Sequence, residues 1–284
     1  MGIAMAGIGV GMQIIVPITQ YVISNYGWRA AFWVLAAFVL AIVIPLNAIF
    51  QRKNPQEIGE FPDGVRTPMA SKIERIEDPQ LIPIWTLKDS VRTSQFQLLC
   101  LTFFFTAFAI QGTLIHQVAH IVDKGFSAKQ GAFFFGLSGI MGSTGKILFG
   151  HLSDKIGRNK AFSISIGCAF FGILSLMAIE KQYSWLLYSY ALLFGLGYGS
   201  IAPIYPARVA DLFQGPEFGK IYGLISIAGG LGGAVGTWLY GKIFDLTSSY
   251  KISFIIVLSD LILIVILFGF TGQSPAHRGK NNPR

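Results

Sequence analysis

The sequence predicts an all-α, polytopic membrane protein, a bundle of helices that cross a lipid bilayer. Three observations lead to this fold class: 52% of the 284 residues are hydrophobic, only 13% are charged, and the mean hydropathy is +0.57. A soluble domain has about a quarter of its residues charged. The apolar residues also lie in long runs, and roughly 20 such residues span the ~30 Å hydrocarbon core of a bilayer.

Eight apolar stretches are long enough to form transmembrane helices. The first is rich in glycine, and the third to the eighth are the most sharply delimited. An even number of spans places both ends of the chain on the same side of the membrane. The predicted spans are residues 2–24, 29–50, 94–118, 130–153, 160–180, 184–207, 218–242 and 250–271.

A long polar segment, residues 51–92, separates the second span from the third. It holds five of the twelve prolines and half of the acidic residues, a composition typical of a linker. Thr86 followed by Asp89 predicts the N-cap of a helix, and Trp85 suits the headgroup region of a bilayer. We expect a linker that ends in an interfacial helix.

The distribution of basic residues predicts the orientation of the chain. The net charge is +8, and the basic residues lie mostly in loops between apolar runs, which indicates membrane topology and no nucleic-acid partner. Loops on the side of the linker hold fifteen Lys and Arg residues, and loops on the other side hold six. Because such residues gather on the cytosolic side, we expect the 51–92 linker and both termini to be cytosolic, in a cell (plasma or inner) membrane.

Pairs of glycines four residues apart recur in the predicted spans. This spacing places both glycines on one helix face, where a neighbouring backbone can approach closely. Static packing and sliding of helices are both open interpretations. The pairs are Gly7 and Gly11, Gly195 and Gly199, Gly229 and Gly233, and Gly232 and Gly236.

One loop carries a recognisable motif, Gly150-His-Leu-Ser-Asp154-Lys155-Ile-Gly157-Arg158, after the fourth span. It resembles the G-x-x-x-D-[R/K]-x-G-[R/K] loop of the major facilitator superfamily, and every position is met. We expect Asp154 to accept hydrogen bonds from a helix N-terminus and a basic side chain, as a latch between two halves. Gly150 and Gly157 permit a tight turn, and Lys155 and Arg158 hold the loop in the cytosol. A plain basic turn is the alternative.

Further stretches resemble the branch of the superfamily that contains monocarboxylate carriers and oxalate/formate exchangers. They are residues 85–92 before a span, His116 near the outer end of that span, and the run from Asp211 to Gly223. The resemblance covers the whole chain. It implies a major facilitator-type bundle in which these eight helices are the fifth to the twelfth of twelve.

The same resemblance predicts the domain organisation. Residues 1–50 would be the last two helices of the N-terminal half, residues 93–272 the C-terminal six-helix half, and residues 273–284 a cytosolic tail. Four helices would then be missing, and Met1 would be an internal methionine of a longer protein. An intact eight-span protein is the alternative.

Lys146 is the leading candidate for a substrate-binding residue. It is the one basic residue that lies more than three residues from either end of a predicted span, and a charge inside a span costs a few kcal/mol. In the branch that the sequence resembles, a cationic residue at this point of the eighth helix meets the substrate carboxylate. Snorkelling of Lys146 to the cytosolic interface is an alternative of equal weight.

Three other polar residues are candidates for substrate or proton binding. We expect Gln111 and His116 to line or gate the outer mouth, with His116 also able to carry a proton. Asp260, inside the last span, is a second candidate proton site. The alternatives are interfacial polar residues in the first case and a neutral, packed carboxyl group in the second.

The predicted function is secondary active transport of a small organic anion, such as a monocarboxylate, by alternating access. It would be a symporter or antiporter, with a proton or another ion coupled. The sequence has no catalytic triad, phosphate-binding loop or set of metal ligands that we can find, so we expect neither an enzyme nor a cofactor. The expected partners are the anion and the lipid bilayer. The alternative is a truncated membrane protein, or a helical membrane partner, that transports nothing.

Overall fold

The structure is a computed structural model that describes residues 2–51 and 85–272. Within these ranges all regular secondary structure is helical, which confirms the predicted all-α class. The chain divides into two compact units, one of residues 14–82 and one of residues 1–13 with 83–284. Residues 52–84 of the predicted linker and all of the predicted tail, residues 273–284, lie outside the described residues.

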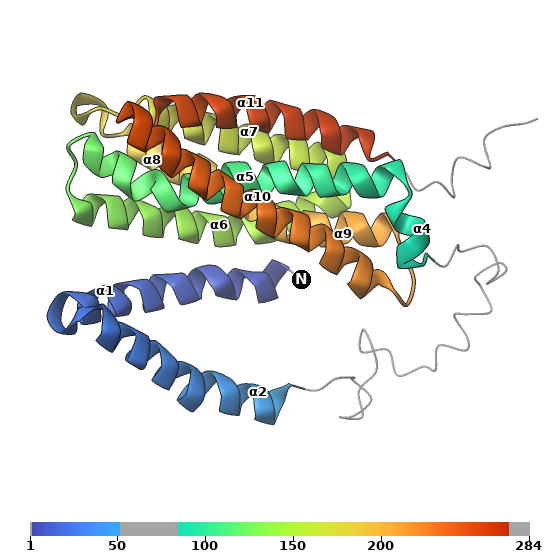
Figure 1. Cartoon of the computed structure of the whole chain (residues 1–284), viewed down its shortest axis with the longest axis horizontal. Helices are drawn as coiled ribbons and strands as arrows, with labels where there is room; N and C mark the ends of the chain where they lie inside the picture. The colour runs from blue at the N-terminus through green and yellow to red at the C-terminus, as the bar shows by residue number, and fades with distance from the viewer. Residues whose placement is uncertain (1, 52–84, 273–284) are drawn as a thin grey trace, which may run out of the picture. The chain divides into compact units, whose positions relative to one another are not determined.

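The N-terminal helical segment is broken once. Helix α1 (Gly2–Phe38) continues through a π-helical turn, η1 (Val39–Val43), into α2 (Ile44–Phe50). Gly27 lies inside α1 with φ 82° and ψ 167°, and the chain reverses direction there (Figure 1). A residue with a Cβ rarely adopts this positive φ, so the glycine permits the reversal. The break lies between the first and second predicted spans.

The larger unit is a bundle of long helices that lie side by side (Figure 1). Helix α5 packs against α10 and α11, α6 packs against α8, and α7 packs against α8 and α11. The helices are α4 (Leu87–Val91), α5 (Ser94–Asp123), α6 (Ala128–Ile156), α7 (Arg158–Met177), the 3-10 turn η5 (Lys181–Tyr183), α8 (Leu186–Gly199), α9 (Ile201–Leu212), α10 (Phe218–Thr247) and α11 (Lys251–Phe270).

Seven helical segments among the described residues are long and apolar enough to cross a membrane. One is Asn25–Phe50, and the other six belong to the larger unit and match the third to eighth predicted spans. Residues 2–24, the first predicted span, are helical but are not among the seven. The count of eight therefore stays a prediction.

The sixth predicted span is divided at Ser200 into α8 and α9, which together form one membrane-length segment. Pro203 has no N–H with which to bond the Gly199 carbonyl, so the helical hydrogen-bond ladder is interrupted at this point. The Ser200 hydroxyl lies 2.8 Å from the Gly197 carbonyl oxygen and 2.7 Å from Ser165 Oγ, so it can donate to either one. The interruption at Ser200 is thus three residues before Pro203.

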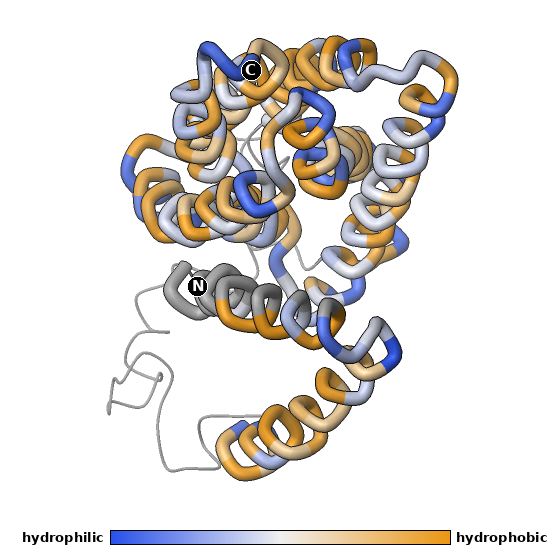
Figure 2. The backbone as a smooth tube through the Cα atoms, turned by 90° about the vertical axis from the view of Figure 1, so that its left-hand side faces the viewer, coloured by the Kyte–Doolittle hydropathy of each residue, from blue (hydrophilic) through white to orange (hydrophobic). Residues whose placement is uncertain are grey.

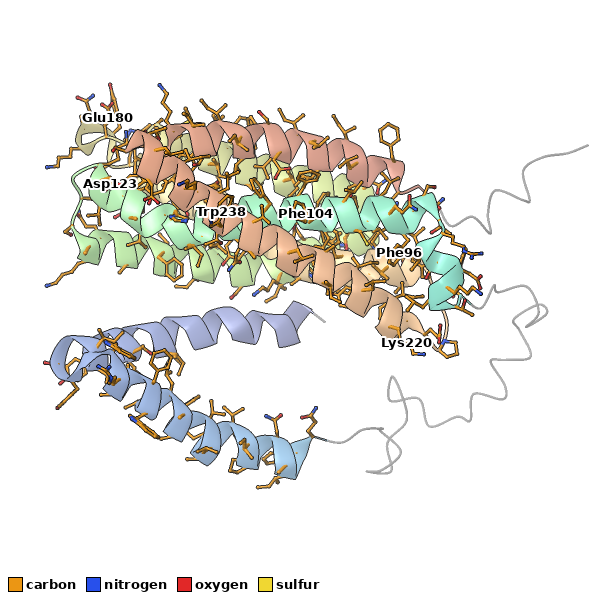
Figure 3. All side chains as sticks on the ribbon, viewed as in Figure 1. Phe96, Phe104, Asp123, Glu180, Lys220 and Trp238 are labelled. Atoms are coloured by element: carbon orange, nitrogen blue, oxygen red, sulfur yellow. The ribbon has the colours of Figure 1, made fainter. Side chains whose placement is uncertain are left out.

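The outer surface of the larger unit suits lipid. Large apolar side chains are exposed along the middle of the helices, among them Ile147, Phe171 and Ile262. Figure 2 shows hydrophobic residues along the helices and hydrophilic residues at their ends and turns. Figure 3 places the charged side chains Asp123 and Lys220 at opposite ends of the bundle. This arrangement is typical of a bundle whose middle lies in hydrocarbon.

The short helix α4 confirms the predicted N-cap before the third span. The Thr86 hydroxyl accepts a hydrogen bond from the Asp89 backbone N–H at 3.2 Å. The start of this helix is tied to the turn before α10, because Leu87 N–H donates to Glu217 Oε2 at 2.7 Å. The Trp85 ring packs edge-on against Phe213.

Candidate substrate-binding and gating site

The motif after the fourth predicted span forms a turn of one residue rather than a loop. Helix α6 ends at Ile156 and α7 begins at Arg158, with Gly157 between them. Gly157 has φ 89°, a conformation that favours glycine. The predicted loop at 151–160 is therefore shorter than expected, because polar residues of the motif continue both helices beyond their apolar parts.

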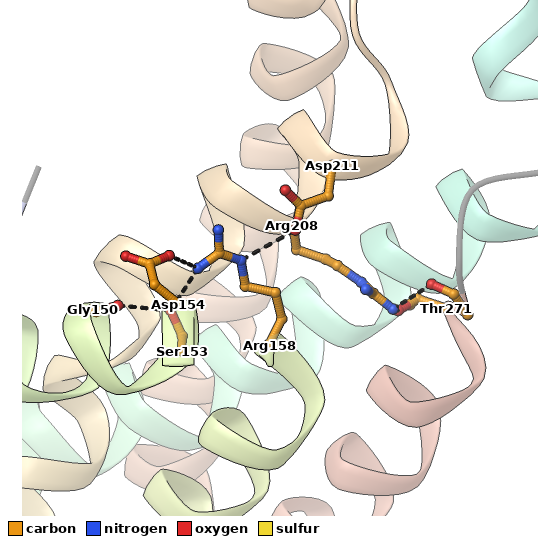
Figure 4. A network of polar contacts seen from close by, with 8 residues as sticks. Gly150, Ser153, Asp154, Arg158, Arg208, Asp211 and Thr271 are labelled. Atoms are coloured by element: carbon orange, nitrogen blue, oxygen red, sulfur yellow. Dashed lines mark hydrogen bonds and ion pairs between the residues drawn. The ribbon is translucent and has the colours of Figure 1, made fainter. Parts of the chain in front are cut away.

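Arg158 is the centre of an ion-pair network at this turn (Figure 4). Its guanidinium binds Asp154 of α6, donates to Ser153 Oγ at 2.7 Å, and donates to Asp211 Oδ2 of α9 at 3.1 Å. Ser153 Oγ in turn donates to the Gly150 carbonyl at 2.9 Å. The network thus joins the α6–α7 turn to the end of α9.

The structure gives Asp154 a partner within its own turn. Its side chain is 66% exposed, and its basic partner is Arg158 of the same motif. Lys155 is exposed as well. A latch from Asp154 to another half of the protein stays a prediction.

Sequence reasoning missed the pairing of Asp211 with Arg158, although both were predicted to lie on the cytosolic side.

A second arginine reinforces the same end of the bundle (Figure 4). Arg208 of α9 is buried and donates through Nε to Thr271 Oγ1 at 3.0 Å and through Nη2 to the Gly272 carbonyl at 2.5 Å. It therefore caps the C-terminal end of α11, where free carbonyl groups attract a cation. The sequence offered no signal for this contact beyond the charge itself.

Lys146 is buried in the bundle. It lies on α6 one helical turn before Gly150, and its side chain is only 7% exposed. Among the described residues, no hydrogen bond or ion pair reaches its ammonium group. Its Nζ is not among the fully buried polar atoms without a partner, so the ammonium group retains some accessible surface although most of the side chain is buried.

Close helix contacts fix the position of Lys146. A Cβ added at Gly145 would overlap the Leu196 carbonyl oxygen of α8. One added at Gly199 would overlap the Gly142 carbonyl oxygen and lie 3.0 Å from the Lys146 backbone nitrogen. The backbones of α6 and α8 are therefore in direct contact where Lys146 lies, as the glycine pair Gly195 and Gly199 predicted.

Gln111 lies in an open groove between α5 and α10. The groove has a volume of about 590 Å³, and its lining includes Gly233, Thr237 and Trp238 of α10. Figure 3 shows Trp238 at the middle of α10, on the side where it passes α5. The glycines leave room beside the Gln111 side chain, which is the polar group that α5 contributes to the groove.

His116 closes one end of this contact between α5 and α10. Its Nε2 lies 3.0 Å from the Thr237 carbonyl oxygen, and its Nδ1 lies 3.3 Å from the Tyr250 hydroxyl oxygen. A carbonyl only accepts, so Nε2 carries the proton in the neutral ring and Nδ1 accepts from Tyr250. No hydrogen bond or ion pair among the described residues joins His116 or Gln111 to Lys146.

Asp260 lies on the buried face of α11, with its side chain 6% exposed. Both carboxylate oxygens are fully buried, and neither accepts a hydrogen bond from the described residues. Asp260 is separate from the Arg158 network and from the groove.

No cluster of three or more metal-ligating side chains occurs in the part of the chain that the structure describes.

These features define the class of protein. A bundle of membrane-length helices, with an apolar outer surface and with ion pairs confined to one end, is a polytopic helical membrane protein. The sequence model of the Major Facilitator Superfamily matches residues 1–237 and 144–284. The chain belongs to this superfamily.

Several named relatives are similar along most of the chain. Monocarboxylate transporter 12 of Rattus norvegicus is 25% identical over 287 residues, which cover 95% of this chain and 58% of that protein. Monocarboxylate transporter 13 of Rattus norvegicus is 25% identical over 259 residues, with 90% and 55% covered. Monocarboxylate transporter 2 of Homo sapiens is 24% identical over 269 residues, with 88% and 54% covered. The resemblance seen in the sequence is confirmed, and the chain spans little more than half the length of these relatives.

Proposed function

We propose that this chain takes part in secondary active transport of a small organic anion, such as a monocarboxylate, by alternating access. Membership of the superfamily and the printed names of the relatives support a small-solute transporter. The single observation that carries the choice of an anion is Lys146, whose side chain is largely buried in the bundle and whose ammonium group has no acidic partner among the described residues.

The chemistry of Lys146 favours a carboxylate as its partner. A buried ammonium group is stabilised by an opposite charge and by hydrogen bonds to its three N–H donors. The described residues supply neither, whereas a small carboxylate brings one negative charge and two acceptor oxygens. Lys146 would then bind substrate directly, at a position fixed by the α6–α8 backbone contact.

The Arg158 network would act as the gate on the cytosolic face. It joins the α6–α7 turn to the end of α9 through exposed ion pairs, which are weak enough to exchange during a conformational change. Asp154, two-thirds exposed, retains acceptor capacity for a further donor. This role includes Gly150, Lys155 and Gly157, with the termini and the 51–92 linker in the cytosol.

The remaining candidates belong to the outer part of the path. Gln111 would contact the solute in the groove between α5 and α10, and His116 would line the mouth and take up a proton there. Residues 1–50 would form the end of an N-terminal half, and residues 93–272 a C-terminal half of six helices. The membrane would be the plasma or inner membrane of the cell.

Uptake into proteoliposomes tests the proposal. The purified chain, and any longer in-frame version that its coding sequence supplies, would be assayed with labelled lactate, pyruvate, formate and oxalate, with and without a pH gradient. We expect saturable uptake of at least one of these anions and stimulation by a proton gradient. Absence of uptake of every anion by both versions would contradict the proposal and favour a protein that does not transport.

A further inference from the structure

The interior of the larger unit contains two orphaned polar groups on one face of α11. Asp260 has both carboxylate oxygens buried without a partner among the described residues, and the buried Ser253 hydroxyl has none either. They are seven residues apart, so they lie about two turns apart on the same helix face. This face packs against α5 and α7, whereas the opposite face of α11 carries exposed apolar side chains such as Ile255 and Ile262.

Two buried tyrosines lie within electrostatic range of the Asp260 side chain. Its carboxyl group interacts electrostatically with Tyr205 of α9 and Tyr240 of α10. The Tyr205 hydroxyl lies 2.8 Å from Thr106 Oγ1, and the Tyr240 hydroxyl lies 3.1 Å from Thr113 Oγ1. Both threonines belong to the buried face of α5. The tyrosines within electrostatic range of Asp260 thus belong to two pairs of hydroxyls that connect α5 to α9 and α10.

No cation among the described residues pairs with Asp260. The buried guanidinium of Arg208 is bound to Thr271 and Gly272, eleven residues further along α11 or about 16 Å. On α5, the titratable groups towards the other end are His116, bound to Tyr250, and His120, whose ring packs against Phe254. On α7, Cys168 is the titratable group within the span.

An ionised carboxylate in this position would be buried without a counter-charge or a hydrogen bond. Such burial is so costly that the group takes up a proton instead. A protonated carboxyl carries no net charge, so its burial needs no counter-charge. The protonated form is thus compatible with the packed helices, and the ionised form is not.

We propose that Asp260 is a proton-binding site inside the helical bundle, which holds its proton while α11 is packed against α5 and α7. The proton leaves only when water reaches this face of α11, so protonation is coupled to the packing of that helix. The site is distinct from Lys146, and the proposal does not depend on the identity of a transported anion.

Infrared difference spectroscopy tests the proposal on the full chain in lipid nanodiscs, without any transport assay. A protonated carboxyl absorbs at a C=O stretching frequency separate from that of a carboxylate. We expect the protein to retain one protonated-carboxyl band at neutral pH, where exposed acids are ionised. The band should be lost in Asp260→Asn and kept in the matched control Asp245→Asn, which removes an exposed acid from the neighbouring helix α10.

A second variant guards against a failure of Asp260→Asn to fold. Asp260→Glu keeps the carboxyl and moves it by one methylene, so the band should shift in frequency without disappearing. Far-UV circular dichroism would establish that each variant is helical. Absence of the band from the unmodified protein at neutral pH would overturn the proposal, as would an unchanged band in folded Asp260→Asn or in folded Asp260→Glu.

Discussion

Two helix contacts of the larger unit, α6–α8 and α5–α10, both depend on glycine but use it differently. In α6–α8 both helices contribute glycines, so that Gly145 meets the Leu196 carbonyl and Gly199 meets the Gly142 carbonyl. In α5–α10 the glycines come mainly from α10. There Gly232 meets the Phe104 carbonyl of α5.

The difference explains why one contact is closed and the other contains a groove. Glycines on both helices bring the two backbones of α6 and α8 together beside Lys146. In α5–α10, Gly232 and Gly236 also meet carbonyl groups of the partner helix, but Gly230 meets nothing within 4 Å, and an open groove remains beside Gln111. The same residue type therefore closes one contact and leaves a groove in the other.

The substitution with the largest expected effect disrupts the close contact between α6 and α8. Gly145→Ala places a Cβ against the Leu196 backbone, which cannot move without separating α6 from α8. We expect a loss of about 2 kcal/mol in the free energy of unfolding, in the range of overpacked cores. Thermal unfolding in detergent, followed by reaction of Cys100 and Cys168 with a thiol-reactive dye, measures it. Gly167→Ala is the control, since no atom lies within 4 Å of its Cβ position.

A second substitution tests the one-sided contact. Gly232→Ala would overlap the Phe104 carbonyl, whereas Gly230→Ala on the same helix meets nothing within 4 Å. We expect Gly232→Ala to lower the unfolding temperature, because the added Cβ has no room beside the Phe104 carbonyl oxygen. Gly230→Ala should stabilise by about 0.5–1 kcal/mol through helix propensity. Equal unfolding temperatures for the two variants would contradict the assigned contact.

The smallest effect concerns the end of the α5–α10 contact, where Glu217 ties α10 to the start of α4. A hydrogen bond from Lys220, and then one from the Leu87 N–H, lowers the pKa of Glu217 below its usual range. Because the folded pKa is lowered, the ionised carboxylate contributes stability above its unfolded pKa and loses it as the pH falls through the folded pKa. Protection of the Leu87 amide against hydrogen exchange should therefore decrease on the acid side.

The matched variant for this effect is Glu217→Gln, which carries no titrating group. Protection of the Leu87 amide in this variant should be lower at neutral pH and should not change further on acidification, once corrected for intrinsic exchange. An acid-induced loss of protection that is the same in both proteins would show that another group is responsible.

Hydropathy was sufficient to predict the six long helical segments of the larger unit. The ends of the helices were predicted less well. Residues 243–247 continue α10 beyond the predicted span 218–242, because Lys242 and Asp245 end the apolar run without ending the helix. The break at Gly27 fell where a polar turn was predicted, but the positive φ that produces it could not be read from the sequence.

The candidate site was predicted as separate residues rather than as contacts. The motif from Gly150 to Arg158 was evident, but the partner Asp211 lies 53 residues further along the chain. Its pairing depends on how α9 packs, which sequence spacing does not reveal. A packed Asp260 was one of the two sequence-based interpretations, but its position on the face of α11 that meets α5 and α7 depends on how that helix packs.

The most direct test of the proposed function is carboxylate uptake by variants of Lys146 in proteoliposomes. We predict that Lys146→Gln abolishes uptake, that Lys146→Arg retains part of it, and that Lys129→Gln, which changes an exposed lysine on the same helix, leaves it intact. Equal amounts of folded protein in each preparation are the condition for the comparison. Uptake by Lys146→Gln with unchanged kinetics would remove Lys146 from the substrate site and contradict the account.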